Sequence, residues 1–122
     1  MARILVIDDD EQIRRMLRQM LERVGYEVAD APDGDEGIRL YRKRPADVVI
    51  TDIIMQEKEG LQAIMELRRE FPGVKIIAIS GGGRLGGPES YLDFAKRFGA
   101  VRTFTKPIRK EKLLNAISEV LK

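Results

Sequence analysis

The sequence predicts an α/β protein in which five parallel strands alternate along the chain with five helices. Short aliphatic runs, typical of strands that are covered on both faces, recur along the chain. Between them lie longer segments whose apolar residues are spaced three and four positions apart, which is the period of an amphipathic helix. Such alternation indicates a parallel sheet with right-handed crossovers and helices on both faces. The chain has 122 residues, which is the length of one domain, and we predict a single domain over residues 1–122.

The first strand and helix show both patterns most clearly. Ile4 to Ile7 form an unbroken aliphatic run, as expected of a buried strand. The following helix has one apolar stripe, made of Ile13, Met16, Leu17, Met20, Leu21 and Val24. We expect Asp10 to cap the first turn of this helix. We expect Gly25 to adopt the left-handed conformation that ends many helices.

The four remaining repeats follow the same pattern. The expected strands cover residues 26–31, 47–51, 74–79 and 101–105, and the expected helices cover residues 33–43, 59–70, 88–98 and 108–121. Residues 81–87 contain five glycines and are predicted to be a loop. This loop includes a Gly-x-Gly-x-x-Gly pattern, but it follows the fourth strand and no acidic residue stands about 20 positions further on. A dinucleotide site is therefore not expected.

Composition excludes several kinds of chemistry. The chain has no cysteine and no histidine, which excludes disulfides, thiol nucleophiles, Cys/His zinc sites and a histidine general base. The net charge of +2 argues neither for nor against nucleic acid, but with no Trp, three Tyr and four Phe a platform for stacking bases is not expected, and we expect no direct nucleic-acid partner. No apolar run approaches the roughly 20 residues of a membrane span, and the N-terminus does not resemble a signal peptide. We therefore expect a cytoplasmic protein with no membrane partner.

Polar residues gather where four of the five predicted strands end. The first strand is followed by Asp8, Asp9 and Asp10, the third ends in Asp52, the fourth ends in Ser80, and the fifth is followed by Lys106. In open parallel sheets, ligands bind beyond the carboxyl ends of the strands. If the strand order is 2-1-3-4-5, these groups converge on one edge of the sheet.

The residue types at this edge suit phosphoryl chemistry with a divalent cation. Carboxylates held close together repel one another unless a cation is present. Mg²⁺ prefers oxygen ligands and is usually held by one or two carboxylates together with phosphate. Lys106 would offer a fixed positive charge to a phosphoryl oxygen, and Ser80 would offer a hydroxyl donor. A carboxylate can itself be the nucleophile and form an aspartyl-phosphate.

Four motifs in this order resemble the signature of bacterial two-component response-regulator receiver domains. They are the runs Ile4-Leu5-Val6-Ile7-Asp8-Asp9-Asp10, Val48-Val49-Ile50-Thr51-Asp52-Ile53-Ile54-Met55, Ile79-Ser80-Gly81 and Phe104-Thr105-Lys106-Pro107. The resemblance covers essentially the whole chain. It implies a flavodoxin-like (βα)5 three-layer sandwich with a parallel sheet of order 2-1-3-4-5.

The resemblance also implies the roles of individual residues. Asp52 would accept the phosphoryl group, Lys106 would contact it, and the hydroxyl of Ser80 would move toward it. The implied Mg²⁺ ligands are Asp8, Asp9, Asp52 and the backbone carbonyl of Ile54. The phosphoryl group would come from a histidine kinase, a phosphotransfer protein or a small phosphodonor. The output would be contact with a downstream protein target, by a monomer or weak dimer that is not an enzyme beyond slow self-dephosphorylation.

Two other functions fit part of the pattern. Asp8-x-Asp10 after an aliphatic strand resembles the nucleophile motif of haloacid-dehalogenase-like phosphatases, which would place the nucleophile on Asp8. Those enzymes normally have a further acidic pair late in the chain, and this sequence lacks one. The second alternative is a receiver-like scaffold that binds its partner without phosphorylation. The intact acidic set and Lys106 argue against the scaffold.

The chain departs from the receiver pattern at three places. Gln56 stands where most receivers have Pro, Thr103 stands where they have Tyr or Phe, and the glycine-rich loop at 81–87 is longer than usual. The aromatic half of the usual switch is therefore missing or replaced, for example by Phe104.

The lifetime of the phosphorylated state can also be predicted. Ile54 and Gly82 each stand two positions past a site residue and would flank the path of the attacking water. Neither side chain offers a group that orients water, so we predict a long-lived aspartyl-phosphate. A half-life of only seconds in Mg²⁺ buffer would contradict this prediction.

Overall fold

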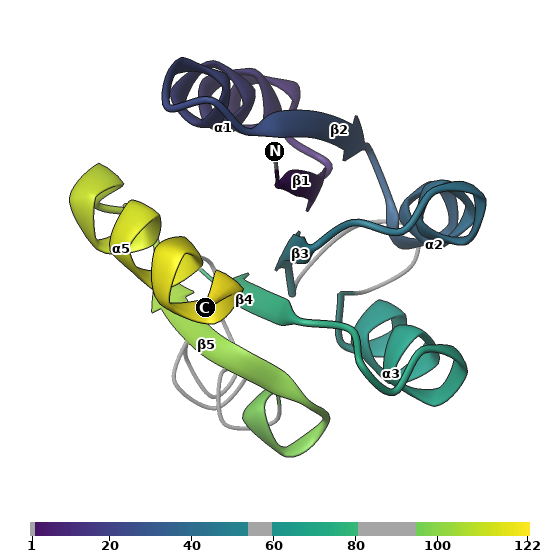
Figure 1. Ribbon diagram of the computed structural model, residues 1–122. Helices are drawn as coiled ribbons and strands as arrows, with labels where there is room; N and C mark the ends of the chain where they lie inside the picture. Colours follow the sequence, from purple (N-terminus) through teal and green to yellow (C-terminus); the bar gives the residue numbers. More distant parts are fainter. Residues whose placement is uncertain (1, 54–59, 81–94) are drawn as a thin grey trace.

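The computed structural model describes residues 2–53, 60–80 and 95–122. Their strands and helices are β1 (Arg3–Ile7), α1 (Glu11–Arg23), β2 (Glu27–Ala31), α2 (Gly34–Lys43), β3 (Val48–Asp52), α3 (Gly60–Glu70), β4 (Ile76–Ser80), β5 (Ala100–Thr105) and α5 (Lys110–Leu121). All strand pairs are parallel, and the order is β2-β1-β3-β4-β5. The predicted α/β fold with strand order 2-1-3-4-5 is confirmed (Figure 1).

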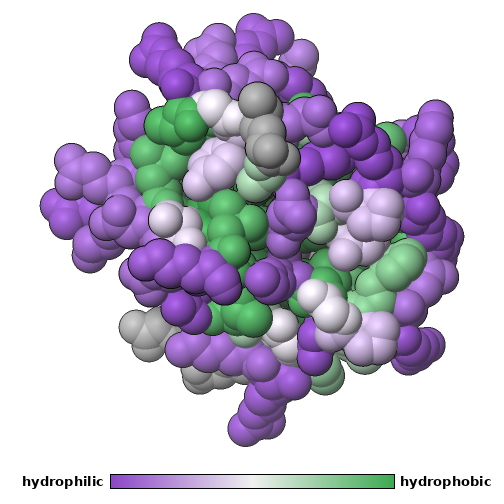
Figure 2. All heavy atoms as spheres, viewed as in Figure 1, coloured by the Kyte–Doolittle hydropathy of each residue, from purple (hydrophilic) through white to green (hydrophobic). Residues whose placement is uncertain are grey.

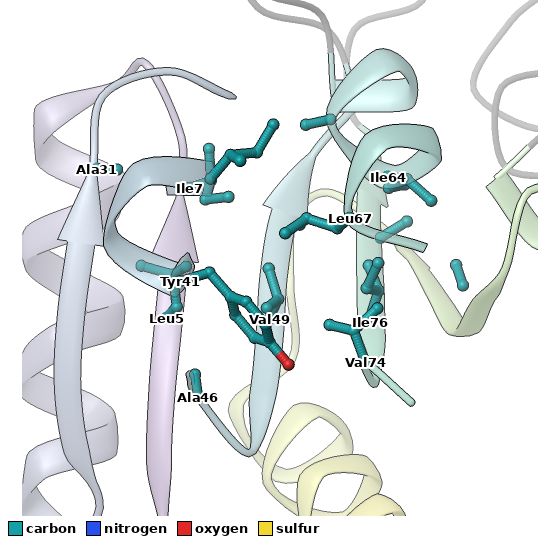
Figure 3. Close-up of a cluster of buried hydrophobic side chains, with 14 of the residues drawn as sticks. Leu5, Ile7, Ala31, Tyr41, Ala46, Val49, Ile64, Leu67, Val74 and Ile76 are labelled. Carbon is teal, nitrogen blue, oxygen red and sulfur yellow. The ribbon is translucent and has the colours of Figure 1, made fainter. Parts of the chain in front are cut away.

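Helices cover both faces of the sheet, and one apolar cluster lies under each layer. Alternate residues of β1 divide between the clusters: Leu5 and Ile7 belong to one, Ile4 and Val6 to the other. The first cluster also takes buried residues from α2 and α3, and Figure 3 shows part of it. The second takes buried residues from α1 and α5. The central strands β1, β3 and β4 are covered on both faces, so their sequences are mostly aliphatic rather than alternating.

The two ends of α1 follow the predicted signals. Asp10 is the N-cap, and its carboxylate accepts hydrogen bonds from the backbone N–H groups of Gln12 and Ile13. After the helix, Gly25 has a φ of +99°, a left-handed conformation that a residue with a Cβ rarely adopts. Because Asp10 is the N-cap, the helix begins at Glu11, two residues ahead of its first apolar residue, Ile13.

The structure differs from the predicted elements in three details: β4 begins at Ile76 instead of residue 74, the apolar stripe of α1 is only partly buried, and the last helix begins later than predicted. In the apolar stripe of α1, Leu17 and Leu21 are buried, but Met16 and Val24 are about half exposed. The last helix begins at Lys110 instead of residue 108, because the backbone of the N-cap residue, Arg109, is extended. Apolar periodicity locates a helix, whereas backbone conformation at the cap decides where it begins.

The surface is mainly polar in the view of Figure 2. Hydrophilic residues cover the periphery of this face, and apolar residues show between them near its centre. None of the helices in the described part of the chain is long and apolar enough to cross a membrane.

Candidate functional site

The carboxyl ends of β1, β3, β4 and β5 bring the predicted site residues together. Asp52 and Ser80 are the last residues of β3 and β4. Asp8 and Lys106 directly follow β1 and β5. The backbone N–H of Lys106 donates to the Ser80 carbonyl at 2.9 Å. This bond extends the β4–β5 pairing by one residue and holds the start of the Lys106 loop against the end of β4.

Lys106 connects the two buried carboxylates of the site. Its Nζ lies 2.9 Å from Oδ2 of Asp52 and 3.4 Å from Oδ2 of Asp8. Only 2% of Asp8 and 7% of Asp52 is exposed to solvent. Buried carboxylates need a partner, because removing their charge from water is costly. The ammonium group supplies that partner and fixes the two side chains relative to each other.

Three acidic residues could share one divalent cation. Asp8, Asp9 and Asp52 each place a carboxylate oxygen within 4.8 Å of the others. Asp8 and Asp52 are buried and Asp9 is exposed, so the group opens to solvent on one side. A set of carboxylate oxygens with an open side fits Mg²⁺, which takes oxygen ligands and keeps several waters.

Ser80 places a buried hydroxyl at the end of β4. The residue is completely buried, and its Oγ has no hydrogen-bond partner among the residues that the structure describes. Buried polar atoms nearly always have partners, so an orphaned hydroxyl beside a cluster of charged groups calls for an explanation. A phosphoryl oxygen at the site would provide the missing acceptor.

The charges at the site change the acidity of two groups. Burial raises the pKa of Asp8, and the nearby Asp52 carboxylate raises it further, against the opposing effects of the Asp10 N–H and Lys106. Burial alone would lower the pKa of Lys106, but its hydrogen bonds to Asp52 and Asp8 and their charges outweigh burial and raise it. Lys106 therefore stays protonated, whereas ionising Asp8 lowers the stability of the folded state.

We predict that the contribution of Asp8 to the stability of the metal-free protein falls as the pH rises. Folded Asp8 keeps its proton to higher pH than unfolded Asp8, so stability falls between the ordinary Asp pKa and the raised one. Asp8→Asn removes the charge and should be more stable than the wild type at neutral pH. Urea unfolding in EDTA at several pH values measures the difference.

Asp33→Asn is the matched control for this prediction. It also removes one negative charge, and Asn can replace Asp33 as the N-cap of α2. We expect little change in its stability. An Asp8→Asn variant that is less stable than the wild type at neutral pH would contradict the prediction.

Two residues at the site were not predicted from the sequence. Nη1 of Arg14, in α1, donates to the backbone carbonyl of Asp8 at 2.7 Å. Gly60 begins α3 so close to β3 that a Cβ there would lie 1.9 Å from the Asp52 carbonyl oxygen. No local pattern marks Arg14, because α1 has four arginines and only packing distinguishes them. The sequence offered no clear signal for Gly60, since glycine costs stability inside a helix but is tolerated at its start.

The predicted departures from the receiver pattern lie partly outside the described residues. The residues that lie outside the described part of the chain are Ile54, Gln56, Gly82 and the rest of the loop 81–87, together with most of the helix expected at 88–98. Thr103 is in β5, where it pairs with Ala78. Phe104 packs against the cluster under α1 and α5, together with Ile77 and Ile79. In this structure its side chain is therefore partly buried against the core beneath those helices.

Comparison with known proteins agrees with the fold and identifies the family. The family model described as the response regulator receiver domain matches residues 4–118. Protein PilH of Pseudomonas aeruginosa is 36% identical over 123 residues, which cover 99% of this chain and 98% of PilH. Among longer relatives, the transcriptional regulatory protein GlrR of Escherichia coli is 32% identical over 98% of this chain, which spans only 26% of GlrR.

Solved structures show the same similarity. A response regulator receiver domain protein from Clostridium thermocellum superimposes with a TM-score of 0.91 at 31% identity, covering 99% of this chain and 94% of that one. The response regulator TrrA of Thermotoga maritima, in complex with Mg(2+)-BeF, gives a TM-score of 0.87 at 29% identity and covers 99% of this chain and all of TrrA. The haloacid-dehalogenase-like alternative finds no support in these matches. The chain belongs to the response regulator receiver domain family, whose members are signalling domains.

Proposed function

We propose that residues 1–122 form one receiver domain in which Asp52 accepts a phosphoryl group. The observation that carries the proposal is the contact of Lys106 with both Asp52 and Asp8, beside the shared acidic group and the orphaned hydroxyl of Ser80. A lone structural ion pair would explain Lys106 and Asp52. It would not explain two further carboxylates at the same strand ends, or a buried Ser80 hydroxyl that has no partner among the described residues.

The proposed reaction transfers a phosphoryl group to a carboxylate oxygen. An oxygen of Asp52 forms the new bond to phosphorus, while the bond from phosphorus to the donor breaks. With acetyl phosphate the leaving group is acetate, and with a phosphohistidine it is the imidazole. Lys106 offsets the negative charge on the phosphoryl oxygens, and the Ser80 hydroxyl donates to one of them. As a carboxylate nucleophile, Asp52 attacks phosphorus through oxygen without passing a proton to a base.

The acidic residues would hold Mg²⁺. Asp8, Asp9 and Asp52 are the proposed side-chain ligands, and the Ile54 carbonyl stays a prediction because it lies outside the described residues. When bound, Mg²⁺ would neutralise charge on the carboxylates and on the incoming phosphoryl oxygens. Asp9, as the exposed member of the group, would be the most accessible ligand.

The proposed partners are a histidine kinase or a phosphotransfer protein upstream and a protein target downstream. We propose no turnover of a substrate beyond slow loss of the phosphoryl group from Asp52. We propose no direct contact with nucleic acid or with a membrane. The expected cytoplasmic location and monomeric or weakly dimeric state stay predictions.

Mapping the phosphoryl group tests the function directly. The protein is incubated with acetyl phosphate and Mg²⁺, and the modified residue is identified by mass spectrometry after peptide cleavage. Modification of Asp52 supports the receiver function. Modification of Asp8 would favour phosphatase-like chemistry, and no modification would favour a scaffold that works without phosphorylation.

We also predict that Mg²⁺ stabilises the fold through the acidic residues. A ligand that binds only the native state raises its stability, so millimolar Mg²⁺ should raise the melting temperature of the wild type. Asp9→Asn should lose most of this shift, because Asp9 is a proposed ligand. Asp10→Asn is the control: Asn can still cap α1, and the shift should be kept. Equal shifts in Asp9→Asn and the wild type would remove Asp9 from the metal site.

A further inference from the structure

We infer that Arg14 is a positioning residue that holds the two neighbouring acidic residues, Asp8 and Asp9, in the orientation that Mg²⁺ requires. The inference rests on the proposed function. Its starting observation is the hydrogen bond of 2.7 Å from Nη1 of Arg14 to the Asp8 carbonyl. That carbonyl belongs to the peptide that joins Asp8 to Asp9. Because a peptide group is planar, fixing its oxygen fixes the direction in which the chain enters Asp9.

The remaining polar groups of Asp8 are also held. Its backbone N–H donates to the Ala31 carbonyl at 3.1 Å. One carboxylate oxygen accepts from the Asp10 N–H at 2.9 Å, and the other lies 3.4 Å from Lys106 Nζ. The hydrogen bond from Arg14 holds the remaining polar group of Asp8, its backbone carbonyl, which is part of the peptide that leads to Asp9. Asp9 itself is exposed, and the peptide that precedes it sets the point from which its side chain starts.

Arg14 is in turn held by an acidic residue of β2. Its Nε lies 3.6 Å from Oδ1 of Asp30, and its side chain is only 16% exposed. The other oxygen of Asp30 lies 2.9 Å from Nε of Arg18. Asp30 therefore connects two of the four arginines of α1, Arg14 and Arg18, to the end of β2. A guanidinium group suits this task, because its planar fork can donate to a carbonyl and face a carboxylate at once.

The alternative is that Arg14 only ties α1 to the sheet. In that case its loss would lower stability without changing how well the native protein binds metal. The positioning role predicts a specific loss of Mg²⁺ affinity, since groups that orient metal ligands typically affect affinity by about 10- to 100-fold. Affinity and stability are measured separately, so the two roles give different results.

The test compares variants by Mg²⁺ titration calorimetry and by the chemical shifts of the Asp9 and Asp10 amides without metal. Arg14→Met should weaken Mg²⁺ binding about tenfold and shift both amides. Arg14→Lys should recover part of the affinity, because its ammonium can still donate to the Asp8 carbonyl. Asp30→Asn should weaken binding less than Arg14→Met, since it removes the charge that holds Arg14 and keeps the donor.

Arg15→Met is the matched control, because Arg15 lies on the same helix but is exposed and pairs only with Glu11 among the described contacts. It should bind Mg²⁺ like the wild type. If Arg14→Met does not fold, Arg14→Lys and Asp30→Asn still decide the question. If the wild type binds Mg²⁺ and is phosphorylated, and all the Arg14 and Asp30 variants bind Mg²⁺ as tightly as the wild type, this inference alone is overturned. Failure of the wild type to bind Mg²⁺ or to accept phosphate would overturn the proposed function and this inference with it.

Discussion

Asp52→Asn should abolish phosphorylation by acetyl phosphate completely. An amide is not nucleophilic, and no other carboxylate occupies the position at the end of β3 that lies 2.9 Å from Lys106 Nζ. Asn has nearly the same shape as Asp, so the core beneath β3 should be preserved. The measurement is the intact mass of the protein after incubation with acetyl phosphate and Mg²⁺: the wild type should gain one phosphoryl group and the variant none.

Asp10→Asn is the control for Asp52→Asn. It also removes one negative charge near the acidic residues, but it leaves the cap of α1 in place. This variant should be phosphorylated at close to the wild-type rate. Full incorporation of phosphate into Asp52→Asn would show that another residue is the acceptor, and peptide mapping would identify it.

Gly60→Ala should destabilise the protein strongly and slow phosphorylation as well. A Cβ at this position would lie 1.9 Å from the Asp52 carbonyl oxygen and 2.6 Å from Ile53 Cα. Both are backbone atoms, so no side-chain rotation can relieve the overlap. The start of α3 or the end of β3 must move, and Ile53, which is 1% exposed, must move with it. Overpacking of this kind costs about 3 kcal/mol, a large part of the ~5–15 kcal/mol that stabilises a typical domain.

Gly73→Ala is the control, since a Cβ there meets nothing within 4 Å. Urea unfolding should give nearly wild-type stability for Gly73→Ala and a much lower midpoint for Gly60→Ala. The phosphorylation rate of Gly60→Ala should also fall, because the displaced backbone carries the acceptor residue. Equal stability of the two variants would show that α3 can shift away from β3 at little cost.

Local chemistry explains why so much of the fold could be predicted. The aliphatic run Ile4–Ile7 required burial on both faces, and only a central strand of a parallel sheet provides it. Asp10 and Gly25 marked the two ends of α1 because capping acts over one turn and leaves a signal in the sequence. The start of the last helix was misplaced, since Ile108 extends the apolar period into residues whose backbone is extended.

The residues of the candidate site could be identified from the sequence because the carboxyl ends of parallel strands lie at the same edge of the sheet. Given five strands and their order, Asp8, Asp52, Ser80 and Lys106 had to lie near one another. Distances and burial could not be predicted, because they depend on side-chain packing. The structure therefore adds that Lys106 reaches both carboxylates and that the Ser80 hydroxyl is buried.

The amino-acid sequence by itself determined the strand and helix order, the acidic and basic groups at the strand ends, and the family to which they point. Only the tertiary structure decided which arginine of α1 reaches the Asp8 carbonyl and how closely Gly60 approaches Asp52. Strands and helices form through interactions between residues that are near in sequence and through burial of one face, and both produce a regular spacing of apolar residues in the sequence. A contact between one side chain and one backbone atom arises from packing in three dimensions and produces no such spacing.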